Sequence, residues 1–221
     1  MKRLLVTIDG PGGAGKTTIS RMLAEKLEYR YIDTGALYRG IALAVKSARI
    51  DPADESAVQT VCRSLDLRFV RQGTAMRLFA GQRDISDEIR TPAISMLASA
   101  VSAQPNVRQC LLGLQRELGR GGGAVFEGRD MGTVVFPAAD VKFFLDASLK
   151  TRALRRYREL LPPNLQPLAE VERDMARRDK SDSSRALAPL KPAADAIIID
   201  SSELSIDAVA ALMLSYIKKA L

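Results

Sequence analysis

The feature that most constrains this chain is a short glycine-rich run near its start, Gly10-Pro11-Gly12-Gly13-Ala14-Gly15-Lys16-Thr17. It matches the pattern G-x-x-x-x-G-K-[ST], in which glycines let successive backbone N–H groups converge on phosphate oxygens. The apolar segment 3–9 precedes the run, and apolar residues at helical spacing follow it over 19–27. A strand, a glycine loop and a helix in this order predict the phosphate-binding corner of an α/β fold, with a nucleoside triphosphate as its ligand.

Each part of this loop has an expected role. The Lys16 side chain would reach the β- and γ-phosphates, and the Thr17 hydroxyl would bind Mg²⁺. Asp33 is a candidate to help hold a Mg²⁺-bound water, or it has a structural role in a turn. Asp146 and Asp200 each end an apolar run and resemble a Walker-B carboxylate, and the sequence does not choose between them. The expected ATP-binding residues are Gly10, Pro11, Gly12, Gly13, Ala14, Gly15, Lys16, Thr17 and Thr18.

The rest of the chain alternates short apolar runs with helical patterns. Candidate strands lie at 29–33, 124–127, 141–145 and 196–199, and helical patterns at 36–45, 92–119 (broken near Pro105, and starting at Thr91-Pro92) and 205–219. This alternation implies right-handed crossovers and a parallel sheet covered by helices on both faces. Two short strands around Gly73, at 66–71 and 75–80, indicate a small inserted lobe, and Leu161-Pro162-Pro163-Asn164 interrupts a basic region over 150–185.

The amino-acid composition excludes several kinds of catalytic and metal-binding site. The chain has no histidine, which excludes Ser-His-Asp triads and imidazole metal sites. Cys62 and Cys110 are too few for a zinc cluster, and their apolar surroundings predict reduced, buried thiols. The net charge of +7 fits a solvated basic surface, a pocket for polyanionic small molecules or a nucleic-acid surface, and composition alone does not separate these.

The phosphate loop is shared by several protein classes. Motor and ABC-type ATPases are usually much longer, and GTPases need an Asn-Lys-x-Asp motif, whereas Asn106 and Asn164 are followed by Val and Leu. A small-molecule kinase of this size remains. Such an enzyme must neutralise clustered phosphate charges and exclude water, and the chain offers Arg39, Arg129 and a run of arginines over 152–185.

Five segments together resemble one family. They are GPGGAGKT, DTGALYRG at 33–40, DEIRTP at 87–92, EGRDMGTVVFP at 127–137 and SRALAPL at 184–190, and in order and spacing they resemble the bacterial cytidylate kinases. The resemblance covers essentially the whole chain. It implies transfer of the γ-phosphoryl group of ATP to CMP or dCMP, with Mg²⁺, by a P-loop kinase that has a monophosphate-binding lobe and a short lid.

The same resemblance implies roles for individual residues. Thr34, Tyr38, Arg39 and Arg129 would lie by the acceptor phosphate; Ser99, Arg108 and Asp130 would read cytosine; Asp182 and Arg185 would contact the acceptor nucleoside; and Arg178 would belong to the lid. The expected catalytic residues are Lys16, Arg39, Arg129 and Arg178. The chemistry of the base agrees, because an aspartate can accept from the cytosine amine while an arginine donates to N3 or O2.

These expectations describe a single P-loop kinase domain over 1–221. Its core is expected at about 1–50, 92–150 and 186–221, its inserted lobe at about 51–91 and its lid region at about 151–185. ATP and CMP or dCMP are the expected partners of a cytoplasmic monomer that binds neither nucleic acid nor membrane. The alternatives are a P-loop kinase for UMP, thymidylate or an anionic metabolite, and an ATP-dependent nucleic-acid-binding protein. Against the last stands an aromatic content of 5% without tryptophan, which leaves little for base stacking.

Overall fold

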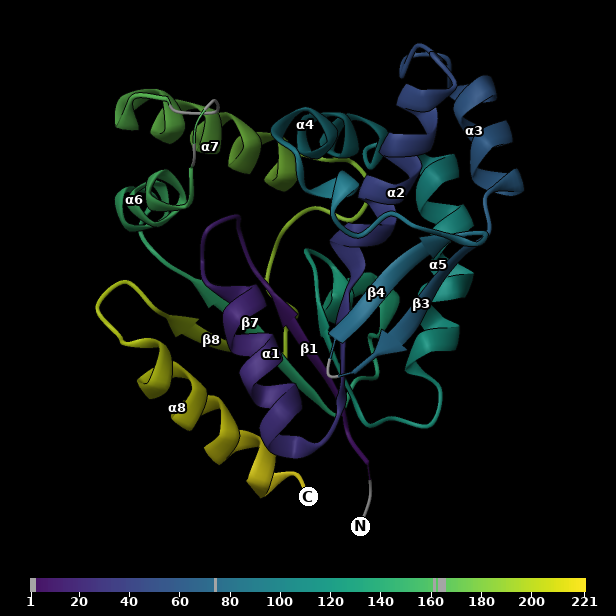
Figure 1. Ribbon diagram of the computed structural model, residues 1–221. Coiled ribbons are helices and arrows are strands. Elements are labelled where there is room, and N and C mark those ends of the chain that lie inside the picture. The colour runs from purple at the N-terminus through teal and green to yellow at the C-terminus, as the bar shows by residue number, and fades with distance from the viewer. Residues whose placement is uncertain (1–2, 74, 161, 163–165) are drawn as a thin grey trace. The chain divides into compact units, whose positions relative to one another are not determined.

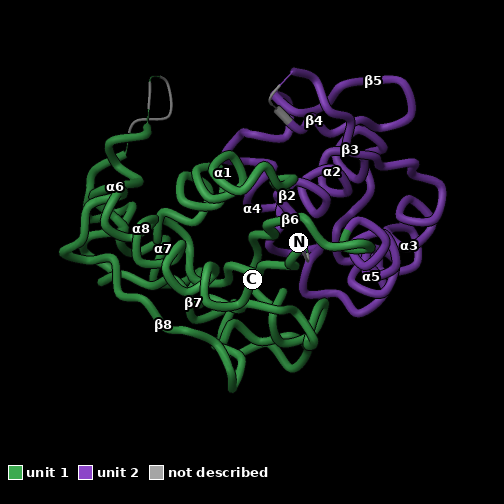
Figure 2. The backbone as a smooth tube through the Cα atoms, turned by 90° about the horizontal axis from the view of Figure 1, so that it is seen from below, with its two compact units in different colours: residues 1–32, 119–221 green, residues 33–118 purple. Residues whose placement is uncertain are grey.

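The computed structural model describes residues 3–73, 75–160, 162 and 166–221. The chain divides into two compact units, Met1–Ile32 with Gly119–Leu221 and Asp33–Leu118 (Figure 2). The second unit is larger than the predicted lobe of 51–91, because flanking helices share its apolar core. The roles predicted for that lobe and for the lid region 151–185 remain predictions. The predicted interruption at 161–164 lies, apart from Pro162, outside the described residues.

The first unit is built on a parallel sheet. Its strands are β1 (Leu5–Asp9), β2 (Arg30–Asp33), β6 (Ala124–Glu127), β7 (Val141–Asp146) and β8 (Ile197–Asp200), in the spatial order β2-β6-β1-β7-β8. Strand β1 pairs in parallel with β6 and β7, and β7 pairs in parallel with β8. All five strands were expected from the apolar runs, and the order places β1 at the centre of the sheet, where a phosphate loop that follows it meets its neighbours' carboxyl ends.

Helices flank this sheet. Helix α1 (Lys16–Leu27) packs against β6 and against α8 (Ile206–Lys219), which also contacts β7 (Figure 1). Leu23 of α1 and Met213 of α8 are fully buried in the core that these elements share with the sheet. Helices α6 (Leu149–Glu159) and α7 (Leu168–Ser183) pack against each other. The sheet and its helices confirm the predicted α/β class.

One irregular element follows β6. Residues Met131–Val135 form a short π-helix, η2, in which the Phe136 N–H donates to the Met131 carbonyl. Such single turns are rare and occur frequently at functional sites. The sequence analysis did not predict it, because the stretch is apolar without a helical or alternating period.

The second unit packs helices around a small antiparallel sheet. Its helices are α2 (Thr34–Ser47), α3 (Glu55–Ser64), the short 3₁₀ turn η1 (Glu88–Arg90), α4 (Pro92–Val101) and α5 (Pro105–Gly119), and its strands are β3 (Leu67–Gln72), β4 (Ala75–Ala80) and β5 (Arg83–Asp84). The strand order is β3-β4-β5, and Thr91 caps α4 as expected by accepting the Ile94 N–H. Helix α3 was not predicted, although Asp54 caps it and the buried Val58 and Cys62 lie four residues apart.

The prediction for the two cysteines was half right. Both thiols are free, but only Cys62 is buried, and Cys110 on α5 is exposed. Val107 and Leu111 occupy the inward face of α5, and Cys110 lies beside that face, where its thiol donates to the Cys62 carbonyl at 3.2 Å. Across the described ranges, none of the helices combines the length and the apolar character that crossing a bilayer requires.

Candidate active site

The glycine loop leaves β1 and enters α1 in a conformation that only glycine fits. Gly10 has φ of +145°, and a Cβ there would lie 2.0 Å from the Leu145 carbonyl oxygen of β7. Gly15 precedes α1 with φ of +93°, and no side chain of the described residues caps the first turn. The first N–H groups of α1 therefore keep the capacity to bind an anion at the positive end of the helix.

Lys16 is buried inside this loop. Its Nζ donates to the Pro11 carbonyl at 2.7 Å, which folds the side chain back over the loop. Burial lowers the pKa of Lys16 well below its ordinary value, the charge of Arg129 lowers it further, and the carboxylates of Glu127 and Asp9 oppose the shift. A bound polyphosphate would place further negative charge next to Lys16 and so favour its protonated, ammonium form.

The Thr17 hydroxyl contacts a carboxylate that the sequence analysis missed. It donates to Glu127 Oε1 at 2.8 Å, and Glu127 is buried at the end of β6, the neighbour of β1. A hydroxyl and a carboxylate are hard oxygen donors of the kind that Mg²⁺ takes together with substrate phosphates. The signal in the sequence was an apolar run, AVFE, that ends in an acidic residue.

The carboxylates considered from sequence are engaged in local turns. Asp146 Oδ1 accepts the Ala147 N–H and Asp200 Oδ1 accepts the Ser202 N–H, both at 2.8 Å. No group of three or more acidic or cysteine side chains among the described residues could hold a metal by itself.

Arg129 and Asp130 follow directly after β6. The Arg129 Nη1 donates to the carbonyl of Gly10 at 2.8 Å, and its Nε donates to Asp182 Oδ2 at 3.0 Å. Asp130 is buried and lies immediately before η2. The structure thus places one predicted clamp, Arg129, against the first residue of the phosphate loop.

Asp182 on α7 is a shared partner of several of the predicted arginines. Besides Arg129, it accepts from Arg185 Nη2 at 2.5 Å, and Arg178 Nε lies 4.0 Å away. Burial alone would raise the pKa of the Asp182 carboxyl, but the charges of Arg129 and Arg185 outweigh it and keep the pKa below its ordinary value. Three arginines predicted from sequence therefore meet around one buried carboxylate, Asp182, which was itself predicted.

Two further arginines, on α6, contact backbone carbonyls of the phosphate loop. Arg152 donates to the carbonyls of Gly12 and Ala147, at 3.2 and 2.8 Å, and pairs with Asp179 of α7 at 2.7 Å. Arg155 Nη1 lies 3.4 Å from the Ala14 carbonyl. These contacts with the carbonyls of Gly12 and Ala14 help to hold the peptide planes of the loop in place.

The other predicted residues lie in the unit Asp33–Leu118. Asp33 caps α2 by accepting the Ala36 N–H at 3.1 Å and pairs with Arg39 at 2.6 Å. The Nε of Arg39 is buried without a hydrogen-bond partner among the described residues. The Arg108 guanidinium lies over the Tyr38 ring, 5.6 Å from its centroid. This unit therefore brings Tyr38 and Arg108 together, with Thr34 buried at the start of α2 and Ser99 half-buried on α4.

Comparison with known proteins gives a consistent result. A family profile described as cytidylate kinase matches residues 6–219. A protein named cytidylate kinase from Syntrophotalea carbinolica is 49% identical over 221 residues, covering 98% of this chain and 92% of that protein. Cytidylate kinases from Geobacter sulfurreducens and Vibrio cholerae are 50% and 43% identical, covering 98% of this chain and 93% and 97% of their own lengths.

Solved structures resemble the fold at low sequence identity. A shikimate kinase from Bacteroides thetaiotaomicron has a TM-score of 0.52 at 12% identity, covering 97% of this chain and 98% of its own. An uncharacterised protein from Eubacterium ventriosum has a TM-score of 0.55 at 12% identity, covering 98% and 99%. At such identities the likeness concerns the fold, an α/β arrangement that a small-molecule kinase shares.

Proposed function

Because the chain belongs to the cytidylate kinase family, we propose that it transfers the γ-phosphoryl group of ATP to CMP or dCMP, giving ADP and CDP or dCDP. The observation that carries this function is a family match from residue 6 to residue 219 in a chain whose phosphate loop has the required geometry. Another P-loop kinase or a nucleic-acid-binding protein would not be expected to match this family from end to end.

The donor would bind at the phosphate loop. Backbone N–H groups of 10–15 and the first turn of α1 would hold the phosphates, and Lys16 would leave the Pro11 carbonyl for the β- and γ-phosphate oxygens. Thr17 and Glu127 would hold Mg²⁺ together with the phosphates. Such an ion would supply positive charge that neutralises part of the phosphate charge.

The acceptor would be held by the residues that the resemblance implies, which are Thr34, Tyr38, Arg39, Ser99, Arg108, Arg129, Asp130, Asp182 and Arg185. The buried Nε of Arg39 has no hydrogen-bond partner within the part of the chain that the structure describes, which supports its role in binding the acceptor phosphate, since a buried donor without a partner is costly. Asp130 would accept from the cytosine amine, and uracil, which carries an oxygen at that position, would face the same carboxylate unfavourably.

Catalysis would consist of positioning and charge stabilisation. An oxygen of the CMP phosphate attacks the γ-phosphorus as the bond to the ADP oxygen breaks, without a covalent enzyme intermediate. Lys16, Arg39, Arg129 and Arg178 would gather the negative charge of the transferring group. The buried Asp182 supports this assignment for Arg129 and Arg178, because it keeps guanidinium groups next to the loop.

An assay of ADP release, coupled to a reporter enzyme, tests the function directly. CMP, dCMP, UMP, dTMP, AMP and GMP are each offered with MgATP, and CMP or dCMP should give the highest kcat/KM. A faster reaction with any other monophosphate would replace the proposed acceptor. Donor consumption without any monophosphate would instead indicate a hydrolase. We also propose a cytoplasmic location, which the two free thiols support.

A further inference from the structure

Asp9, the last residue of β1, is a buried carboxylate to which the proposed function gives no role. Its side chain reaches across to the segment after β6. Oδ1 accepts the Met131 N–H and Oδ2 accepts the Gly132 N–H, both at 2.8 Å. Each carboxylate oxygen therefore holds one of two successive backbone donors, 122 and 123 residues away in sequence.

The two donors belong to the start of η2. The first N–H groups of a helix have no acceptor within the helix and need one from elsewhere. Gly132 approaches closely, since a Cβ there would lie 3.2 Å from both Thr7 Oγ1 and Lys142 Cδ. Burial raises the pKa of Asp9 to about 6, although the two N–H groups oppose that shift. Burial of the Asp9 carboxylate costs free energy, and its hydrogen bonds from two backbone N–H groups offset part of that cost.

These contacts fix a segment that carries two proposed acceptor residues. On its other side, the Gly128 N–H donates to the Ile8 carbonyl of β1 at 3.1 Å. Arg129 and Asp130 therefore lie between two anchors, Ile8 and Asp9, that are neighbours on one strand. The strand continues directly into Gly10, whose carbonyl also accepts from Arg129.

We propose that Asp9 is a positioning residue for the phosphoryl acceptor, which sets the orientation of Arg129 and Asp130 relative to the phosphate loop by holding both N–H groups at the start of η2. The proposal rests on the proposed function, because it takes Arg129 and Asp130 as acceptor-binding residues. In this proposal, the carboxyl end of β1 aligns the residues that would bind the acceptor with the phosphate loop that would bind the donor.

The decisive variant is Asp9→Asn, which keeps the size of the side chain but leaves only one acceptor oxygen and turns an amide N–H₂ toward a backbone N–H. Asp140→Asn is the matched control. Asp140 Oδ2 accepts the Leu5 N–H at 2.8 Å, at the opposite end of the same strand. Both variants remove a carboxylate that anchors a backbone donor at an end of β1, and only Asp9 faces the proposed acceptor residues.

Steady-state kinetics with CMP, UMP and ATP, together with thermal unfolding, separate the outcomes. For Asp9→Asn we expect the KM for CMP to rise roughly tenfold, the effect of losing one buried hydrogen bond. The CMP-to-UMP ratio of kcat/KM should fall, and the KM for ATP should change little. For Asp140→Asn we expect no change in either KM or in this ratio.

Three results would overturn the proposal. One is a lowered unfolding temperature with an unchanged KM for CMP, which marks a purely structural role. Another is a rise confined to the KM for ATP, which would mean that Asp9 acts through the charge of Lys16. The third is full additivity of Asp9→Asn with Asp130→Ala in the free energy of CMP binding.

Two controls keep the test decisive. If Asp9→Asn does not fold, Asp9→Ser removes the contact without the opposed amide and is measured in the same way. Failure of the proposed function would show separately, as a wild-type enzyme that does not phosphorylate CMP.

Discussion

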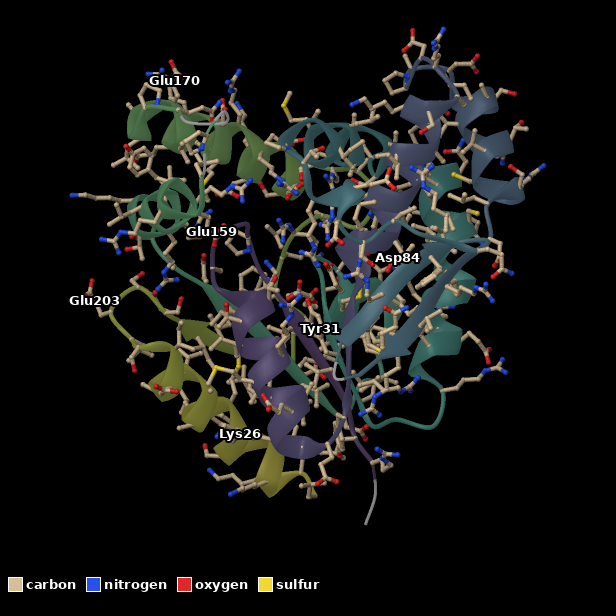
Figure 3. The ribbon with its side chains drawn as sticks, in the orientation of Figure 1. Lys26, Tyr31, Asp84, Glu159, Glu170 and Glu203 are labelled. Atoms are coloured by element: carbon tan, nitrogen blue, oxygen red, sulfur yellow. The ribbon has the colours of Figure 1, made fainter. Side chains whose placement is uncertain are left out.

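Two regions of the molecule use arginine–carboxylate pairs in opposite ways. Around the phosphate loop, Arg129 pairs through Nε with the nearly fully buried Asp182, and its Nη1 donates to the Gly10 carbonyl. On the β4–β5 hairpin, Arg77 pairs with Asp84, which is labelled in Figure 3. It also pairs with Asp87, which lies just after the hairpin and whose side chain is 81% exposed. Buried pairs are strongly directional and expensive to break, whereas exposed pairs contribute little. Arg129 and Arg77 are themselves similarly exposed, at 21% and 31%, so the difference lies in the burial of their carboxylate partners.

Two aspartates show the same contrast in their titration. Burial raises the pKa of Asp9 to about 6. For Asp84, hydrogen bonds from Arg77 and Ser86 outweigh desolvation and lower the pKa to about 2. Asp9 is buried and accepts hydrogen bonds from neutral backbone N–H groups, whereas Asp84 pairs with a cationic guanidinium near solvent. The direction of each pKa shift therefore follows from the surroundings of the carboxyl group.

The largest effect should follow from Lys16→Ala in the buried region. Loss of the ammonium group should reduce kcat/KM by roughly 10²–10³-fold or more, because the charge on the transferring phosphoryl group is no longer stabilised. Lys26→Ala, an exposed change at the far end of the same helix, should leave the rate unchanged. Similar kinetics for the two variants would contradict the role of the loop, provided that circular dichroism shows both to be folded.

Asp130→Ala should come next and should separate acceptor from donor. We expect kcat/KM for CMP to fall roughly 10- to 100-fold, since the cytosine amine loses its acceptor. ATP affinity, measured by calorimetric titration, should stay within a few-fold of wild type. Equal losses for ATP and CMP would show that Asp130 supports the fold of the buried region instead of reading the base.

Proton uptake on nucleotide binding should reveal the charge state of Lys16. The lowered pKa means that part of the Lys16 population is neutral at about pH 8, and a bound triphosphate favours the protonated form. ATP binding should therefore take up protons, and its affinity should fall as the pH rises. Calorimetry in buffers of different ionisation enthalpy measures the uptake. Lys16→Met should abolish it; uptake that persists in this variant would have to come from another group.

The smallest effect should come from Arg77→Gln on the hairpin. The folded-state pKa of Asp84 is depressed below its ordinary 3.8, so the stability it contributes is present above that value and is lost as the pH falls toward about 2. The variant should unfold at a slightly lower temperature than wild type near neutral pH, and the two curves should converge in acid. A difference that persists at low pH would mean that Arg77 stabilises the hairpin by packing, not by charge.

Local patterns were sufficient for most of the fold. The apolar runs and the Thr91-Pro92 signal correspond to strands and helix starts that the structure contains. Helix α3 was missed because only two of its residues are buried. The exposure of Cys110 was missed because an apolar neighbourhood in sequence does not say which face of a helix is inward.

The site was less accessible from sequence. The phosphate loop is a contiguous motif, and the structure gives it the expected geometry. Glu127 and Asp9 act across strands, and their partners become neighbours only once β6 is placed beside β1. Without the spatial order of the strands, Asp33 was a candidate to help hold a Mg²⁺-bound water, and the sequence did not choose between Asp146 and Asp200 as a Walker-B carboxylate. The roles of the acceptor residues remain predictions that the variants above address.

Helix α7 carries two carboxylates that pair with arginines outside the helix, Asp179 and Asp182, three residues apart and so on one side of the helix. One additional residue inserted within α7 ahead of Asp179 would rotate both by about 100°. Arg152 and Arg129 would both lose their carboxylate partners. Their guanidinium groups would then no longer be held in position to donate to the loop carbonyls of Gly12 and Gly10. This stretch should therefore accept many replacements on its outward side and almost no change in length.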